Sequence, residues 1–220
     1  MRTATPARPR TGASRSRGRR RRFWLWLLLA AVIVVGAAGV REYGFSSGWA
    51  ATRRVERLAQ ATVPDYVDYQ PLEIGNARSG ARLEDFTGVV IHYVGNPGTS
   101  ARNNRQYFAQ ESTQVCSHFI IGLEGEVIQC LPLEERSAAS NSRNRDTISI
   151  EVCHPDAGGQ FTPATYQAVV ELTAWLCRTG HLSADAVIRH YDVTGKLCPL
   201  YYVDHEDAWR QLQQDVANRI

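Results

Sequence analysis

The chain contains 220 residues, of which 44% are hydrophobic and 21% are charged. A single core is comfortable at about 150 residues, so this composition indicates one ordinary domain and an additional segment. The formal net charge of +3 does not indicate a nucleic-acid-binding domain, because nine of the 25 basic residues lie in residues 1–22 and only 16 accompany the 22 acidic residues of 23–220. We therefore expect no nucleic-acid partner.

The N-terminus differs in composition from the rest of the chain. Residues 1–22 contain nine arginines, no acidic residue, and Pro, Ser, Gly and Thr between the arginines. A segment of this kind cannot bury an apolar core, so we expect a disordered tail. The next eighteen residues, 23–40, carry no charge. As a helix they would extend about 27 Å, which suits a hydrocarbon core of about 30 Å.

We interpret residues 23–40 as a transmembrane signal anchor, with Trp24 and Trp26 placed for the membrane interface. Because positive residues stay on the cytoplasmic side, the tail is predicted to be cytoplasmic and the chain from Arg41 onward to be exported. The alternative is a cleaved signal peptide, with cleavage near the small residues 36–39, which would give a secreted protein. We favour the anchor, because the apolar run is longer than the usual hydrophobic region of a signal peptide.

The exported part is predicted to contain a linker and one domain. Residues 41–62 are interpreted as a juxtamembrane linker, helical over 50–61, and residues 63–220 as the folded domain. Prolines, glycines and polar residues over 63–86 predict an extended lead-in that wraps the domain.

The first half of the domain contains three further predicted elements. The residues GVVIH, 88–92, predict a short buried strand that ends at His92. A helix is predicted over 101–111. Apolar segments over 117–121 and 126–131 flank a glycine-containing turn and predict a β-hairpin.

Polar residues near these strands have competing interpretations. We interpret His118, in the first hairpin strand, as a histidine that is hydrogen-bonded within the sheet. We prefer this to the alternative that it is a fourth ligand of the three-ligand metal site described below. The polar loop 132–145 is of a kind that can bind sugar or peptide beside a cleft, although most such loops are solvated, and no binding residue is assigned to it. Strand 147–152 alternates apolar and polar residues, which places Glu151 on its polar face.

Two helices are predicted in the second half. The first is capped by Thr162, has Pro163 at its first position and runs to about Arg178, closed by Gly180. The final helix is predicted to begin at Asp204 as its N-cap. Strands that alternate with helices predict an α/β fold, with a single mixed β-sheet flanked by helices.

The stretch VIRHYDVTGKLCP, residues 187–199, predicts an apolar strand ending in His190 and a polar loop that carries Lys196 and Cys198. Imidazole and thiolate are both good zinc ligands, and a catalytic zinc site needs three protein ligands. His92 is the best third candidate, because it also ends a short buried strand. Lys196 is the only lysine of the chain. Either a compact ammonium suits this position better than a guanidinium, or its uniqueness is chance.

Four motifs occur in the order IHYVGNPG, SHFIIGLEGEVIQCLPL, ISIEVCHPD and RHYDVTGKLCP. Together they resemble the zinc-dependent N-acetylmuramoyl-L-alanine amidase family. That family includes phage endolysins and bacterial cell-wall amidases, and the peptidoglycan recognition proteins share its fold. The resemblance implies one Zn²⁺ per chain, held by His92, His190 and Cys198, with Glu151 and Lys196 as the catalytic pair.

The implied reaction is hydrolysis of the amide bond between N-acetylmuramic acid and L-alanine in peptidoglycan. Glu151 would transfer a proton from water to the leaving amine, and Lys196 would stabilise the oxyanion. The expected partners are peptidoglycan and the membrane, and the protein is expected to be monomeric. Two alternatives remain: a non-catalytic peptidoglycan-binding receptor of the same fold, and a metallohydrolase of another amide. Non-catalytic relatives typically lose the cysteine ligand, which this chain has at Cys198.

Two further features stay open. Asp192 either orients a metal ligand or caps the loop that contains it. The remaining cysteines either form up to two disulfides outside the membrane or stay free as buried thiols; they are Cys116, Cys130, Cys153 and Cys177.

Overall fold

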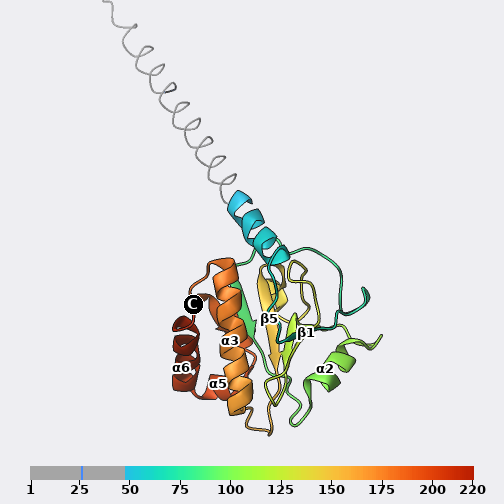
Figure 1. Cartoon of the computed structure of the whole chain (residues 1–220), viewed down its shortest axis with the longest axis vertical. Helices are drawn as coiled ribbons and strands as arrows, with labels where there is room; N and C mark the ends of the chain where they lie inside the picture. The colour runs from blue at the N-terminus through green and yellow to red at the C-terminus, as the bar shows by residue number, and fades with distance from the viewer. Residues whose placement is uncertain (1–25, 27–47) are drawn as a thin grey trace, which may run out of the picture. The chain divides into compact units, whose positions relative to one another are not determined.

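The computed structural model describes Trp26 and residues 48–220 (Figure 1). Residues 49–220 form one compact unit. The predicted tail and, apart from Trp26, the predicted membrane segment lie outside the described residues, as does the first part of the predicted linker. Within the described part of the chain, no helix has both the length and the apolar character that crossing a membrane requires.

Six strands form one mixed sheet in the order β1-β4-β3-β5-β2-β6. Strands β3, β5, β2 and β6 are parallel to one another, whereas β4 is antiparallel to β3 in the predicted hairpin and β1 is parallel to β4. The predicted single mixed sheet is therefore confirmed. The strands are β1 Val67–Tyr69, β2 Gly88–Ile91, β3 Phe119–Ile121, β4 Val127–Gln129, β5 Thr147–Val152 and β6 Val187–Arg189.

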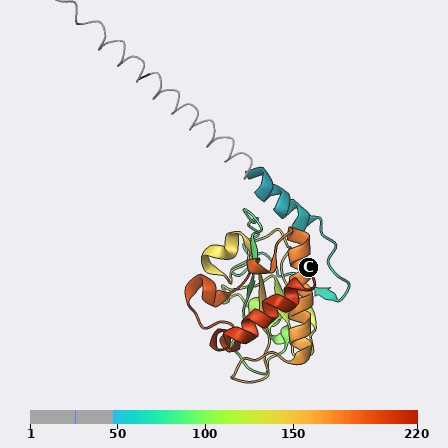
Figure 2. The same cartoon turned by 90° about the vertical axis from the view of Figure 1, so that its left-hand side faces the viewer.

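Helices cover both faces of this sheet (Figures 1 and 2). On one face α3 packs against β2, β3 and α6, and on the other α2 packs against β3 and β4. A helical stretch over residues 48–59 precedes the sheet. The named helices are α2 Ala101–Phe108, α3 Pro163–Gly180, α4 His190–Thr194, α5 Leu200–Asp204 and α6 Glu206–Ala217, with 3₁₀ turns η1 Asn141–Arg145 and η2 Ala184–Ala186.

The central strands are apolar because both of their faces are covered. All four residues of β2 are buried, and the side chains of Ile91, Ile148 and Ile150 are fully inaccessible to solvent. Burying one such side chain stabilises the fold by about 1.5–3 kcal/mol. This core holds the carboxyl ends of β5, β2 and β6 at fixed positions beside one another.

The helix ends agree only partly with the prediction. Thr162 caps α3 as predicted, since its hydroxyl accepts a hydrogen bond from the Thr165 N–H at 3.1 Å. The helix continues through Gly180, and His181 takes the left-handed cap with φ 56°. Helix α2 ends at Phe108, three residues before the predicted end.

The predicted N-cap of the final helix is wrong. Asp204 is the last residue of α5, and α6 begins at Glu206 after His205. The reason lies in the core, where Tyr202 is buried against Phe161 with ring centroids 4.6 Å apart. This contact favours a separate helical turn before α6.

The segment after β6 also differs from the prediction. Strand β6 ends at Arg189, and His190 is the first residue of α4, so the predicted polar loop begins as a short helix. Asp192 provides the cap, because its Oδ2 accepts the Arg189 backbone N–H at 2.8 Å and its Oδ1 pairs with the Arg189 guanidinium at 2.9 Å. Of the two roles considered for Asp192, the structure therefore shows capping.

All five cysteines are free and buried. Of the two possibilities considered for the cysteines, the structure therefore shows free buried thiols and no disulfide. Burial raises the pKa of Cys130 and of Cys153 to about 12, which keeps both side chains as neutral thiols.

Candidate active site

Three neighbouring parallel strands place polar side chains at one edge of the sheet. His92 follows β2, His190 follows β6, and Glu151 is the penultimate residue of β5. Because β5, β2 and β6 are parallel and adjacent, their carboxyl ends meet, which is where open α/β sheets bind ligands.

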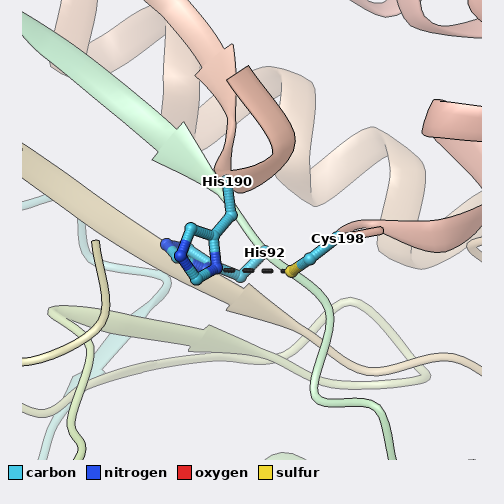
Figure 3. Close-up of side chains that lie close together, drawn as sticks. All are labelled: His92, His190 and Cys198. Carbon is cyan, nitrogen blue, oxygen red and sulfur yellow. Dashed lines mark hydrogen bonds between the residues drawn. The ribbon is translucent and has the colours of Figure 1, made fainter. Parts of the chain in front are cut away.

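The loop after α4 brings Cys198 to the two histidines. The backbone N–H of Tyr191 donates to the Cys198 carbonyl at 2.9 Å, which closes this loop. One possible ligand atom from each of His92, His190 and Cys198 lies within 4.8 Å of the others, and all three residues are buried. Cys198 Sγ is 3.9 Å from His92 Nδ1, the contact drawn as a dashed line in Figure 3. These three side chains could together hold a metal ion, and we refer to them as the metal-ligand cluster.

The ring nitrogens of both histidines are arranged for a metal ion. His92 Nε2 lies 3.0 Å from Ser140 Oγ, and His190 Nε2 lies 2.9 Å from Asn141 Oδ1. The remaining nitrogen, Nδ1, lies next to Cys198 in His92 and is buried in His190 without a hydrogen-bond partner among the described residues. A buried polar atom without a partner needs an explanation, and a bound metal ion would supply one here.

The electrostatics favour neutral, metal-binding imidazoles. Burial, followed by the nearby His190 and Lys196, lowers the pKa of His92 well below its ordinary value. Burial and Lys196 also lower the pKa of His190. Bond lengths of about 2.0–2.3 Å imply ligand separations of about 3.3–3.8 Å around tetrahedral zinc, close to the observed contact between His92 and Cys198. Two imidazoles and a thiol whose ligand atoms all lie within 4.8 Å of one another are therefore a donor set that suits a small ion such as zinc.

Glu151 lies beside the metal-ligand cluster. Its Oε1 is 3.9 Å from His92 Nδ1, and its Oε2 is buried without a hydrogen-bond partner among the described residues. Burial raises the pKa of Glu151 to about 8, against the opposing charge of Lys196. A carboxyl group that titrates near neutral pH can both accept and release a proton, as general acid–base catalysis requires.

All five predicted site residues line one cavity of about 940 Å³. Lys196 is exposed, whereas the three metal-ligand residues are buried. Aromatic side chains of Tyr93, Tyr107 and Phe108 line the same cavity. The volume lies in the range of small-molecule binding sites, about 300–1,000 Å³.

Two residues of this site are missing from the prediction. Residues Ser140 and Asn141 of loop 132–145 contact the two histidines of the metal-ligand cluster. These contacts are with histidines and not with sugar or peptide, so the assignment of no binding residue to this loop stays a prediction. A short run of Ser and Asn occurs in many solvated loops, so the sequence offered no specific signal.

His118 has the structural role that the sequence predicted. Its Nδ1 accepts the Ser149 backbone N–H at 3.0 Å, and its Nε2–H donates to the Glu135 carbonyl at 2.8 Å. Both ring nitrogens are thus occupied within the fold. His118 is not part of the metal-ligand cluster.

Comparison with known proteins gives consistent matches. The family model described as N-acetylmuramoyl-L-alanine amidase matches residues 82–200. N-acetylmuramoyl-L-alanine amidase CwlL of Bacillus licheniformis is 32% identical over 143 residues, which cover 57% of this chain and 39% of that protein. The chain therefore spans about two fifths of the length of this curated relative.

Solved structures show the same fold. The catalytic domain of XlyA matches with a TM-score of 0.59 and 25% identity, over 68% of this chain and 98% of that domain. A mutant endolysin from Bacillus subtilis matches with a TM-score of 0.60 and 24% identity, over 68% of this chain and 97% of the endolysin. Both confirm the predicted α/β fold of the domain.

Proposed function

This chain belongs to the N-acetylmuramoyl-L-alanine amidase family, and on that premise we propose that it hydrolyses the amide bond between N-acetylmuramic acid and L-alanine in peptidoglycan. The observation that carries the proposal is the cluster of His92, His190 and Cys198 beside Glu151 in a single cavity. A peptidoglycan receptor would need the cavity alone. A buried carboxyl group next to three metal-ligating atoms favours hydrolysis.

The proposed cofactor is one Zn²⁺ per chain. Two imidazoles and one thiolate are zinc-type ligands, and three protein ligands are typical of catalytic rather than structural zinc sites. When bound, zinc supplies Lewis-acid chemistry, since it lowers the pKa of water and polarises a carbonyl group. Burial raises the pKa of the metal-free Cys198 thiol to about 12, so zinc binding must release the thiol proton.

Glu151 and Lys196 perform the remaining chemistry. Glu151 accepts a proton from the attacking water and delivers it to the nitrogen of the departing L-alanine. Lys196 lines the cavity from the loop before Cys198, where its ammonium stabilises negative charge on the carbonyl oxygen as water adds. Its positive charge also lowers the pKa of Glu151 and so increases the fraction of Glu151 that is ready to accept a proton.

We further propose that the protein is a monomer anchored in the cell membrane by residues 23–40, with the tail 1–22 cytoplasmic and the domain outside. The support for the membrane anchor and its orientation is the uncharged run of eighteen residues directly after the arginine-rich tail. Protease added to intact cells should then degrade the domain, and alkaline carbonate should leave the protein in the membrane fraction. A protein recovered in the soluble fraction would instead favour cleavage near residues 36–39.

The function is tested with the full chain purified in detergent without added metal. Zinc per chain is measured, and the new amino termini released from purified peptidoglycan are identified on the same sample. We expect about one zinc and free L-alanine termini, with both lost in Cys198→Ala. Zinc without release of L-alanine termini would contradict the amidase activity, and absence of zinc from the wild-type protein would contradict the metal site.

A further inference from the structure

Two consecutive residues of one loop contact both histidines of the metal-ligand cluster. Ser140 Oγ lies 3.0 Å from His92 Nε2, and Asn141 Oδ1 lies 2.9 Å from His190 Nε2. Ser140 is fully buried, and Asn141 lines the cavity. A single loop therefore hydrogen-bonds to Nε2 of both histidines, the ring nitrogen on the side away from Nδ1.

The contact with Asn141 determines which nitrogen of His190 carries the proton. An amide oxygen only accepts hydrogen bonds, so Nε2 of His190 must be the donor. In a neutral imidazole the other nitrogen, Nδ1, then keeps its lone pair. This is the buried nitrogen of His190 that has no partner among the described residues. The Ser140 hydroxyl can accept a hydrogen bond from His92 in the same way, which directs the lone pair of His92 Nδ1 toward Cys198.

The loop is itself held in place by side chains. Asn144 Oδ1 accepts the backbone N–H groups of Ala139 at 3.1 Å and of Ser140 at 2.6 Å. The Arg143 guanidinium donates to Thr87 Oγ1 at 3.0 Å, directly before β2. These contacts place Ser140 and Asn141 relative to the strand that His92 follows.

Asn141 adopts an uncommon backbone conformation, with φ 52°. Asparagine enters the left-handed region more readily than most residues, but the conformation still persists only where the surroundings hold it. An asparagine at position 141 can therefore have either of two roles: it tolerates the positive φ, or it supplies the amide oxygen that His190 needs as a hydrogen-bond acceptor. Glycine tolerates the positive φ but has no side-chain acceptor.

We propose that Ser140 and Asn141 are positioning residues that hold His92 and His190 in the Nε2–H tautomer and thereby set the zinc affinity of this chain. The inference rests on the zinc site of the proposed function and deepens it. Hydrogen bonds to the outer nitrogen of a ligating histidine fix the orientation of the ring, and their loss typically weakens metal binding about 10- to 100-fold.

The test compares four variants of the full chain in detergent. Asn141→Gly keeps the positive φ and removes the acceptor, Asn141→Asp keeps an oxygen acceptor, and Ser140→Ala removes the hydroxyl at His92. Ser142→Ala is the matched control, because Ser142 is exposed on the same 3₁₀ turn and its side chain makes no hydrogen bond to any described residue. Zn²⁺ affinity is measured by competition with a chromophoric chelator, and histidine tautomers are measured by ¹⁵N NMR of the metal-free protein.

Asn141→Gly and Ser140→Ala should each bind Zn²⁺ about 10- to 100-fold more weakly than wild type, while Asn141→Asp and Ser142→Ala bind it as wild type does. In the metal-free wild type, His190 should carry its proton on Nε2, and Asn141→Gly should show a mixture of tautomers. Wild-type affinity in Asn141→Gly, or a proton on Nδ1 of His190 in wild type, would overturn the inference. A wild-type protein that binds no Zn²⁺ would instead overturn the zinc site itself.

Discussion

Strand β5 serves two polar clusters that lie side by side on one face of the sheet. Ser149 bonds His118, and Glu151, two residues further along the strand, lies against His92. Both histidines are buried to the same degree, with exposed fractions of 0% for His118 and 1% for His92. In the first cluster every ring nitrogen has a partner within the fold, whereas the second leaves His190 Nδ1 and one oxygen of Glu151 without a partner among the described residues.

The comparison shows that burial alone does not distinguish a ligand histidine from a structural one. Burial lowers the pKa of both His118 and His92, so both side chains are neutral. What separates the two clusters is hydrogen-bond satisfaction. Both ring nitrogens of His118 have partners within the fold, whereas His190 Nδ1 has none among the described residues, and a metal ion can bind only a nitrogen whose lone pair is free. We call the cluster of His118, Ser149 and Glu135 the closed cluster, and the cluster of His92, His190, Cys198 and Glu151 the open cluster, because only the second offers a free nitrogen to a metal ion.

Replacing Glu151 gives the largest expected effect on the open cluster. Glutamine keeps the size of the side chain but cannot accept the proton, so Glu151→Gln should reduce the hydrolysis rate about 10²- to 10⁴-fold. Zinc content should stay at the wild-type level, because Glu151 is not among the proposed ligands. The rate is measured as release of L-alanine termini from purified peptidoglycan. A variant within tenfold of wild type would show that Glu151 does not move the proton.

Replacing Lys196 should give a somewhat smaller loss of activity. Lys196→Met removes the charge that stabilises the oxyanion, and such losses are about 10²- to 10³-fold. The Lys196 charge also lowers the pKa of Glu151. Without this charge the pKa of Glu151 should rise. The part of the pH–rate profile over which the rate increases with pH should therefore move to higher pH in Lys196→Met. Wild-type turnover in Lys196→Arg would remove any special role for the only lysine of the chain.

Replacing His118 should affect the closed cluster alone. His118→Leu leaves the Ser149 N–H and the Glu135 carbonyl unpaired, which should reduce the free energy of unfolding by about 1–3 kcal/mol. Zinc per chain should not change. Urea unfolding measures the first quantity, and metal analysis of the folded protein measures the second. His92→Leu is the reciprocal control and should lose zinc. If His118→Leu also loses zinc, the two clusters are not independent and the prediction is wrong.

The last expected effect is a pH dependence of stability, which concerns only the metal-free protein. Burial raises the pKa of Glu151 from 4.5 to about 8, so over this interval the folded state keeps a proton that the unfolded state has lost. Raising the pH through this interval should therefore destabilise the folded state. Urea unfolding with a chelator present should show Glu151→Gln gaining stability relative to wild type as the pH rises. A pH-independent difference between the two proteins would contradict the raised pKa.

Local sequence patterns predicted most of the fold. Strand β5 has the predicted bounds, and the hairpin of β3 and β4 and the capped start of α3 agree with the pattern of apolar residues and caps. These elements depend on neighbouring residues, through alternation along a strand or a hydroxyl at a helix start. Asp204 failed as an N-cap because the distant contact of Tyr202 with Phe161 favours a separate turn, α5.

The sequence by itself determined which side chains could form the site, because His92, Glu151, His190, Lys196 and Cys198 stand in motifs that point to one family chemistry. The tertiary structure decided which nitrogen of each histidine is available, since that depends on Ser140 and Asn141 in a loop without a distinctive pattern. A hydrogen bond between residues 48 or 49 positions apart leaves no periodic signal in the chain. Its direction is set only when the strands that precede the two histidines, β2 and β6, pack together with the loop between β4 and β5.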